Sequence, residues 1–265
     1  VDVAECDLTD RDETLKLLDG IKPELIVNTA AMTAVDLAED EPTLADHLNH
    51  ALPGQLAAWC ADHNARLIHY STDYVFGGAQ SRPWREDDPQ SPQSVYGRTK
   101  QAGEHAIMQS GAGALILRTA WLYSALPGNF LTAILNKAAR GESLQVVNDQ
   151  FGSPTWAQSL AEATMHLIRG DLIPKDHTKP VHCVNRGAVS WYEFAKQAVN
   201  QAHTMGLLDS EVEILPVKSD QWPQKATRPT YSVLDTQKYT ELTGIPMPSY
   251  EEALSDCLSQ WSPSS

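Results

Sequence analysis

The sequence has few basic residues relative to acidic ones and no long apolar stretch. Lys and Arg together number 20 against 34 Asp and Glu, so the formal net charge is −14. This charge repels a phosphate backbone, which argues against nucleic acids and anionic membrane surfaces as partners. No segment approaches the roughly 20 apolar residues that a bilayer span needs. With 42% hydrophobic residues over 265 positions, the chain can still bury a core of one large domain or two smaller ones.

Cysteine is also scarce, and several catalytic motifs are missing. The four cysteines are scattered without a CxxC motif, which predicts reduced thiols in a cytoplasmic protein and neither a disulfide framework nor a zinc site. The sequence contains no GxSxG elbow and no P-loop. His47 and His50 share a predicted helix face, but no further His or Cys completes a metal set, so we interpret them as solvated surface residues. The cysteines are Cys6, Cys60, Cys183 and Cys257.

Short apolar runs alternate with longer segments of helical period. This alternation predicts βαβ units, and hence an α/β fold with a parallel sheet flanked by helices. Pro53 should kink or break the second predicted helix unless a turn intervenes, and Ser94 is a candidate N-cap. Ligands gather at the carboxyl ends of such strands. The predicted strands are residues 24–28, 66–71 and 115–119, and the predicted helices begin near Asp10, cover 43–63, start near Ser94 and cover 130–140.

The composition of the sequence changes after about Val147. Prolines and other turn residues become more frequent beyond this point. We therefore expect one domain over residues 1–147 and a smaller second domain over 148–265 that caps the sheet and is interleaved with the first.

Tyr96 and Lys100 are four residues apart in a predicted helix, which places them on one face. A nearby ammonium favours the phenolate, so Lys100 is expected to lower the Tyr96 pKa and to let Tyr96 transfer a proton near neutral pH. Tyr192 and Lys196 have the same spacing, so spacing alone is not specific. The difference lies in context, because a strand that ends in Ser71-Thr72-Asp73 precedes Tyr96. We interpret the Tyr192 pair as part of an ordinary amphipathic helix.

Two further segments could border a ligand, and each has a structural alternative. Residues 28–36 follow a strand with small side chains that let a flat ligand approach the backbone, although a plain strand-to-loop turn explains them equally well. Asp7 follows a short strand and could bind a nucleobase amine or a ribose hydroxyl. An N-cap for the helix that begins near Asp10 is at least as good an explanation for Asp7.

Together these motifs resemble the extended short-chain dehydrogenases/reductases and, more narrowly, the dTDP-4-dehydrorhamnose reductase family. The resemblance extends over almost the whole chain and implies a Rossmann-like sheet, with a dinucleotide-binding domain at 1–147 and a substrate-binding domain at 148–265. Six segments in order carry it: Asn28-Thr29-Ala30-Ala31 with 33–36, residues 70–76, Tyr96-Gly97 with Thr99-Lys100, residues 118–123, residues 148–152 with Pro154-Thr155, and Arg228-Pro229 with Ser232 and Leu234.

The resemblance implies a reaction and roles for particular residues. The reaction would be reduction of the 4-keto group of dTDP-4-dehydro-6-deoxy-L-mannose to dTDP-L-rhamnose, with NADPH or NADH as the hydride donor. Tyr96 would donate a proton to the keto oxygen, Thr72 would hydrogen-bond near that oxygen, and Lys100 would bind the nicotinamide ribose. The cofactor would also be bordered by Asp7, Leu8, Ala30, Ala31, Met32 and Thr33. The substrate would contact Thr72, Asp73, Trp121, Asn148, Gln150 and Arg228.

Some of these implications have alternatives. Arg228 could equally make a structural ion pair. The resemblance also extends to the β subunit of methionine adenosyltransferase, a non-catalytic dinucleotide-binding regulator, and to epimerases or reductases of other nucleotide sugars. Nucleotide-sugar 4,6-dehydratases usually carry Glu where this chain has Tyr74, so elimination lacks its base here. The expected partners are a dTDP-sugar and a second copy in a homodimer.

The chain departs from the family pattern in two places. The glycine-rich phosphate loop is missing, so we expect that about one βαβ unit of roughly 30 residues is absent before Val1. We also expect the chain without this unit to bind NADPH weakly and to be catalytically impaired. The second departure is Gln158, which stands where a metal-bridging acid would be expected, and it predicts that no metal is bound.

Overall fold

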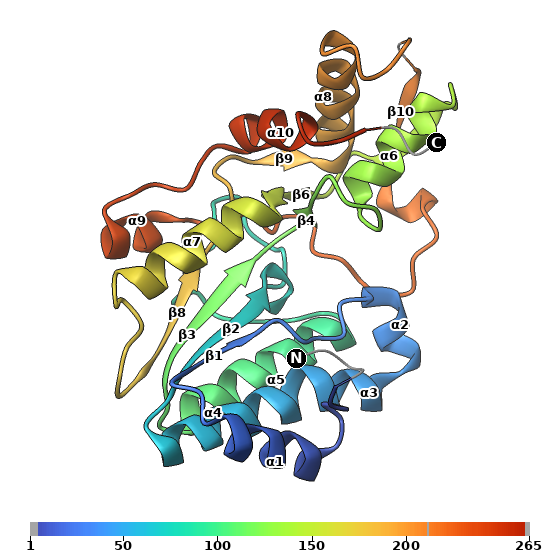
Figure 1. The fold of residues 1–265 in the computed structure, drawn as a ribbon. Helices are drawn as coiled ribbons and strands as arrows, with labels where there is room; N and C mark the ends of the chain where they lie inside the picture. Colours follow the sequence, from blue (N-terminus) through green and yellow to red (C-terminus); the bar gives the residue numbers. More distant parts are fainter. Residues whose placement is uncertain (1–4, 211, 263–265) are drawn as a thin grey trace.

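The main sheet has four parallel strands in the order β1-β2-β3-β8 (Figure 1). The computed structural model describes residues 5–210 and 212–262, so Val1, before which the missing unit was expected, lies outside the described residues. The strands are β1 (Leu25–Asn28), β2 (Arg66–Thr72), β3 (Gly113–Thr119) and β8 (Thr178–His182).

Helices cover both faces of this sheet (Figure 1). The side chains of Leu67 and Ile116 pack in one apolar cluster with α1, α4 and α5, whereas Ile68 and Leu115 pack in another with α7 and α9. Strands buried on both faces need continuous apolar runs, which is the pattern that predicted them. The predicted parallel α/β fold is thus confirmed. These helices are α1 (Arg11–Ile21), α4 (Leu52–His63), α5 (Val95–Gln109), α7 (Ala157–Arg169) and α9 (Gln237–Thr243).

A second group of elements lies beyond the carboxyl ends of the strands and has its own apolar core. It contains the parallel pair β5–β10 and three helices, and the short strand pairs β4–β7 and β6–β9 are separate from the main sheet. The predicted division at residue 147 does not coincide with this grouping in every element, since β8 joins the main sheet and α6 precedes residue 147; the domain boundaries stay a prediction. The elements are α6 (Phe130–Ala139), α8 (Trp191–Thr204), α10 (Tyr250–Leu258), β4 (Leu122–Tyr123), β5 (Leu144–Val147), β6 (Phe151–Gly152), β7 (Thr155–Trp156), β9 (Val189–Ser190) and β10 (Ile214–Val217).

The segment predicted as one helix over 43–63 is helical throughout, but a π turn interrupts its α-helical pattern before Pro53. It contains α3 (Pro42–Asp46), a π-helical turn η1 (His47–Ala51) and α4, and it follows α2 (Val35–Asp40). Pro53 lies in the first turn of α4, where a missing N–H costs no helical hydrogen bond. The wide π turn holds the buried Asn49, whose side chain bonds both the backbone N and O of Met32.

Ser94 caps α5 as predicted, since its Oγ accepts from the Gly97 backbone N at 3.1 Å. Gly97 allows the first turn of α5 to approach η2 (Asp73–Val75), because a Cβ there would lie 2.4 Å from the Tyr74 carbonyl oxygen. This close approach places Tyr96 beside the carboxyl end of β2. Among the described residues, no helix has the length and apolar character needed to cross a bilayer.

Candidate active site

A cavity of about 350 Å³ opens at the carboxyl ends of β2 and β3. The two strands end side by side, with Thr72 paired to Thr119. Of the residues singled out in the sequence, Thr33, Thr72, Asp73, Tyr96 and Trp121 all line this cavity. The structure therefore brings together groups that are up to 88 positions apart along the chain.

Two polar atoms at this edge have no partner. The Thr72 hydroxyl donates to Asp73 Oδ1 at 3.0 Å and accepts from the Tyr74 backbone N at 3.1 Å. Asp73 Oδ2 and Thr119 Oγ1 have no hydrogen-bond partner among the described residues, although both are buried. Buried polar groups are nearly always satisfied, so these two atoms are available to a ligand, although the Ser232 side chain is near enough to Asp73 to lower its pKa. Burial also raises the pKa of Asp73 to about 6.

Tyr96 lies in the cavity as predicted, but its pKa is not lowered in the protein without ligands. Burial raises the pKa of Tyr96 to about 12, while the Thr72 side chain opposes this rise. Lys100 is not among the groups that shift this pKa, so the expected lowering by Lys100 stays a prediction. The Lys100 amine points to the backbone of β2 and not to the tyrosine hydroxyl.

Lys100 is buried behind the cavity wall, with 2% of its surface exposed. Its Nζ donates to the Tyr70 carbonyl oxygen at 2.6 Å and lies 3.2 Å from His69 Nε2. Burial lowers the pKa of Lys100 to about 8, and the nearby Glu104 opposes that shift. The amine is therefore close to changing its charge at neutral to mildly alkaline pH.

An aromatic pair forms the opposite wall. The Trp121 ring stacks on Trp191, with centroids 3.5 Å apart, and Phe130 packs against Trp191 at 4.5 Å. Trp121 has a positive φ of 47°, a strained conformation for a residue with a side chain. Gly152 makes room for it, since a Cβ there would lie 2.4 Å from the indole. Sequence reasoning missed Trp191 and Phe130; large aromatics at the first positions of two predicted helices were the available signal.

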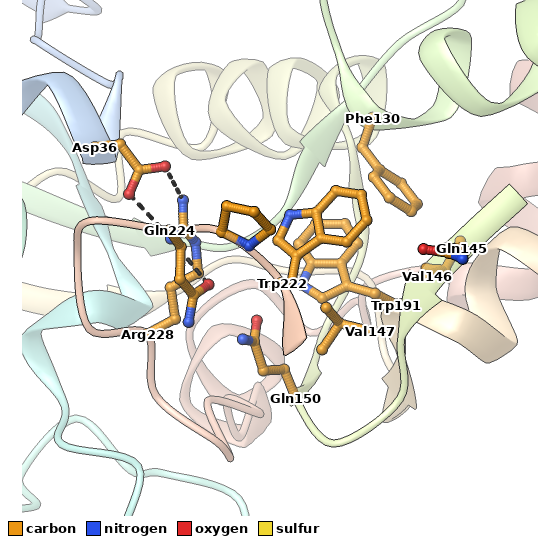
Figure 2. A pocket seen from close by; sticks show the side chains of 11 residues that line it. Asp36, Phe130, Gln145, Val146, Val147, Gln150, Trp191, Trp222, Gln224 and Arg228 are labelled. Atoms are coloured by element: carbon orange, nitrogen blue, oxygen red, sulfur yellow. Dashed lines mark hydrogen bonds and ion pairs between the residues drawn. The ribbon is translucent and has the colours of Figure 1, made fainter. Parts of the chain in front are cut away.

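A second cavity of about 300 Å³ shares Phe130 and Trp191 with the first (Figure 2). Trp222 and Trp191 lie together on one side of it, and Arg228 lies on the other. The Arg228 guanidinium binds both carboxylate oxygens of Asp36, at 2.8 and 3.1 Å. That bond is the main cause that lowers the Asp36 pKa to about 2. Arg228 thus forms the ion pair considered as its alternative, and it still lines the cavity.

The other predicted ligand residues differ in where they lie. Gln150 lines the second cavity and donates to Ser219 Oγ at 2.9 Å. Asn148 lines neither of these two cavities, although its Oδ1 is buried without a partner among the described residues. Its role in substrate binding stays a prediction.

The residues expected to border the cofactor lie in two segments, 7–8 and 30–33, and some of their polar groups are bonded within the protein. Met32 is buried and both its backbone polar groups are bound by Asn49, whereas Ala30 and Ala31 stay partly exposed. Asp7 is exposed, and its carboxylate accepts from the Thr9 N and hydroxyl at 2.9 and 2.7 Å. Asp10, not Asp7, caps α1. Leu8 lines an apolar groove beside β1.

The structure offers no clustered metal ligands within 5–210 and 212–262. Gln158 is exposed and donates to Glu162 at 2.8 Å. The four cysteines are buried and unbonded to one another.

Known proteins resemble the chain over most of its length. The family model described as RmlD substrate binding domain matches residues 1–262. The dTDP-4-dehydrorhamnose reductase of Escherichia coli K12 is 37% identical over 96% of this chain and 85% of its own length. That of Salmonella typhimurium is 38% identical over 87% of this chain and 77% of its own.

A solved structure agrees in fold. The dTDP-4-dehydrorhamnose reductase of Bacillus anthracis, in complex with NADP, superposes with a TM-score of 0.90 at 32% identity, covering 98% of this chain and 89% of its own. With this agreement in sequence and fold, the chain belongs to the RmlD substrate binding domain family, together with these dTDP-4-dehydrorhamnose reductases.

Proposed function

We propose that the chain reduces the 4-keto group of dTDP-4-dehydro-6-deoxy-L-mannose to dTDP-L-rhamnose, with NADPH as the hydride donor and NADH as the alternative. The observation that carries this proposal is the convergence of Thr72, Tyr96 and the unpaired Asp73 Oδ2 on one cavity. The names of the family relatives and the NADP complex of one of them support it.

The donor set fits a nicotinamide dinucleotide. Ala30 and Ala31 are small and partly exposed, and Thr33 reaches the cavity that contains Tyr96. Ala30, Ala31 and Thr33 would border the cofactor, and Lys100 would hold the ribose next to the nicotinamide, since an amine and hydroxyls are suitable partners for ribose oxygens. Bound NADPH would supply the hydride.

Tyr96 supplies the proton in this proposal. A pKa of about 12 keeps the phenol protonated at neutral pH, so it meets the keto oxygen as an acid. The Thr72 hydroxyl donates to Asp73 in the protein without ligands, and by rotating it would donate to the Tyr96 phenolate that remains after transfer and so favour it. Carbon 4 gains the hydride and oxygen 4 gains the Tyr96 proton, which balances the reduction of a ketone to an alcohol.

The two joined cavities suit an elongated substrate. We place the sugar near Tyr96 and Trp121, and the nucleotide in the second cavity beside Trp222, Gln150 and Arg228. Arg228 is half-buried there, and a local cation is needed to hold a diphosphate on a protein with a net charge of −14. Four unbonded, buried thiols support the cytoplasm as the compartment.

A coupled assay tests the proposal. The purified chain is mixed with NADPH and the 4-keto nucleotide sugar, with NADPH raised until the rate no longer increases. We expect mole-for-mole oxidation of NADPH and formation of dTDP-L-rhamnose, and no oxidation without the sugar. A sugar that changes configuration without NADPH oxidation would indicate an epimerase instead. Dinucleotide binding without turnover, with co-purification of a methionine adenosyltransferase, would indicate the regulatory alternative.

A further inference from the structure

Three buried polar side chains form a line behind the wall of the cavity. Asn28 ends β1, His69 lies beside it on β2, and Lys100 reaches the same point from α5. Asn28 Nδ2 lies 3.0 Å from His69 Nδ1, and His69 Nε2 lies 3.2 Å from Lys100 Nζ. All three side chains are buried, so each of these hydrogen bonds must be made within the protein.

The orientation of the Asn28 amide follows from a backbone donor. The Ala30 N–H can only donate, and it lies 3.0 Å from Asn28 Oδ1, so this atom is the amide oxygen. The NH₂ group of Asn28 therefore faces His69 Nδ1 and donates to it. A ring nitrogen that accepts carries no proton, so the proton of the neutral His69 ring is on Nε2.

The Nε2–H group then points at Lys100 Nζ. An ammonium has no lone pair and would face this N–H as a second donor, whereas a neutral amine can accept it. Nζ still donates to the Tyr70 carbonyl oxygen, which a neutral amine also does. We propose that His69 is a positioning residue for the reductase: in the tautomer fixed by Asn28, its Nε2–H favours the neutral amine of Lys100 over the ammonium and so sets the pH at which the amine behind Tyr96 loses its charge.

The charges around Lys100 are consistent with this arrangement. The ionisable groups that act on it are His69 from β2 and Glu104 from its own helix. Arg118 of β3 donates two hydrogen bonds to the Glu104 carboxylate, at 2.8 and 2.9 Å. Because Arg118 neutralises this carboxylate, Glu104 stabilises the charged form of Lys100 only weakly. Burial lowers the Lys100 pKa, and burial together with Lys100 lowers that of His69.

The effect of His69 on the reaction rests on the proposed function, whereas the His69 tautomer does not. If Tyr96 gives its proton to the keto oxygen, a group one helical turn away that gains or loses charge near the working pH controls the field around the phenolate. His69 would thereby shift the pH range of the reaction without touching the substrate. The tautomer itself can be tested whether or not the chain reduces a sugar.

The direct test is NMR of the ligand-free protein labelled with ¹⁵N-histidine. We expect His69 to show a protonated Nε2 and a bare Nδ1 above about pH 8, with shifts that titrate as Lys100 changes charge. Lys100→Met should abolish this titration. A protonated Nδ1 on His69 at this pH, or titration that persists in Lys100→Met, would overturn the proposal.

Two variants test the effect on the reaction. His69→Gln places an amide oxygen that can accept from an ammonium, and Asn28→Asp places a carboxylate that pulls the ring proton to Nδ1. Both should stabilise charged Lys100 and move the alkaline limb of kcat against pH upward, by about one unit.

His182→Gln is the matched control, because His182 is equally buried on β8 and has no contact with Lys100: its Nδ1 bonds the Asp235 carbonyl oxygen and its Nε2 lies 3.4 Å from Arg118, a contact that the glutamine oxygen can replace. It should lower Tm similarly and leave the pH profile in place. If His69→Gln, Asn28→Asp and His182→Gln all lower Tm and none moves the alkaline limb of kcat against pH, His69 is a structural residue and the proposal is wrong. If no variant and no wild-type protein turns over, but the NMR result holds, the proposed function fails and the tautomer assignment stands.

Discussion

The helices α5 and α8 carry the same Tyr-x-x-x-Lys spacing in opposite surroundings. On α5, Tyr96 faces a cavity at the strand ends and Lys100 is enclosed by β2. On α8, Lys196 is exposed and its Nζ lies 6.0 Å from the centre of the Tyr192 ring, and Tyr192 packs against the apolar core of the second group of elements. Neither Tyr192 nor Lys196 lines either of the two cavities.

The difference shows that burial against a strand end, and not the spacing, shifts the pKa values of such a pair and makes it suited to proton transfer. The pKa of Lys100 falls to about 8 because burial penalises its charge. An exposed pair on a helix surface makes a contact of modest energy and keeps its water. Interpreting the Tyr192 pair as structural agrees with its position on α8.

The first prediction has the largest expected effect and concerns stability. It is made for Glu104, which lies one helical turn after Lys100 on the buried face of α5. Glu104 and Arg118 form an ion pair with 0% and 2% of their side chains exposed. Arg118→Met should destabilise the protein by about 3–5 kcal/mol, because it leaves a buried carboxylate without its partner. Urea unfolding measures this. Glu104→Leu combined with Arg118→Met should recover much of the loss, and Arg140→Met, which breaks an exposed pair with Glu142, should leave stability unchanged.

The second prediction compares the two tyrosines directly. Tyr96→Phe removes the proposed acid and should lower kcat by about 10²-fold or more, the usual scale for general acid catalysis. Tyr192→Phe should leave kcat almost unchanged. Steady-state rates of NADPH oxidation with the keto sugar measure both. Equal rates for Tyr96→Phe and the unsubstituted protein would remove the distinction between α5 and α8.

The third prediction concerns Asp73 at the carboxyl end of β2, which lies beside α5 and has no counterpart beside the Tyr192 pair on α8. The folded-state pKa of Asp73 is about 6, above its ordinary value of 3.8, so the folded protein binds the proton more tightly than the unfolded chain. The stability that this protonation provides is present below about pH 4 and is lost as the pH rises through 6. Relative to Asp73→Asn, the protein should therefore lose about 2 kcal/mol between pH 4 and pH 7. Chemical denaturation of both proteins across this range measures it; a flat difference would contradict the assignment.

The sequence predicted the elements that follow from local pattern. The apolar runs identified the strands β1, β2 and β3, and Ser94 was a correct N-cap. The register of Thr72 beside Thr119 follows from parallel pairing of those runs. Pro53 was a true signal of irregularity, but the irregularity is a π turn that directly precedes α4 and depends on how Asn49 packs against Met32.

Features that depend on tertiary contacts could not be predicted from local pattern. The i,i+4 rule placed Lys100 on the face of Tyr96, but the direction of its amine depends on the Tyr70 carbonyl and His69, which come from another element. Likewise, Trp191 opens α8 like any large apolar residue at a helix start. Its stacking on Trp121 depends on the positive φ of Trp121 and on the space beside Gly152.

The smallest predicted effect lies in that aromatic pair, which is where α8 does contribute to the site. Trp191→Ala removes the ring that stacks on Trp121. Aromatic pairs contribute about 0.5–1.5 kcal/mol beyond their burial, so KM for the keto sugar should rise on the order of threefold to tenfold, with kcat changed less. Trp121→Ala should raise KM by a similar amount, since both rings of the stacked pair line the cavity.

Two neighbours of the pair provide the controls. Tyr192→Ala, one position along α8, should leave KM unchanged. Gly152→Ala should act like a partial Trp121 variant, because the added Cβ would displace the indole. If Trp191→Ala and Trp121→Ala lower Tm sharply while KM stays constant, the pair is a packing element between the two groups of helices, and α8 then contributes nothing to substrate binding.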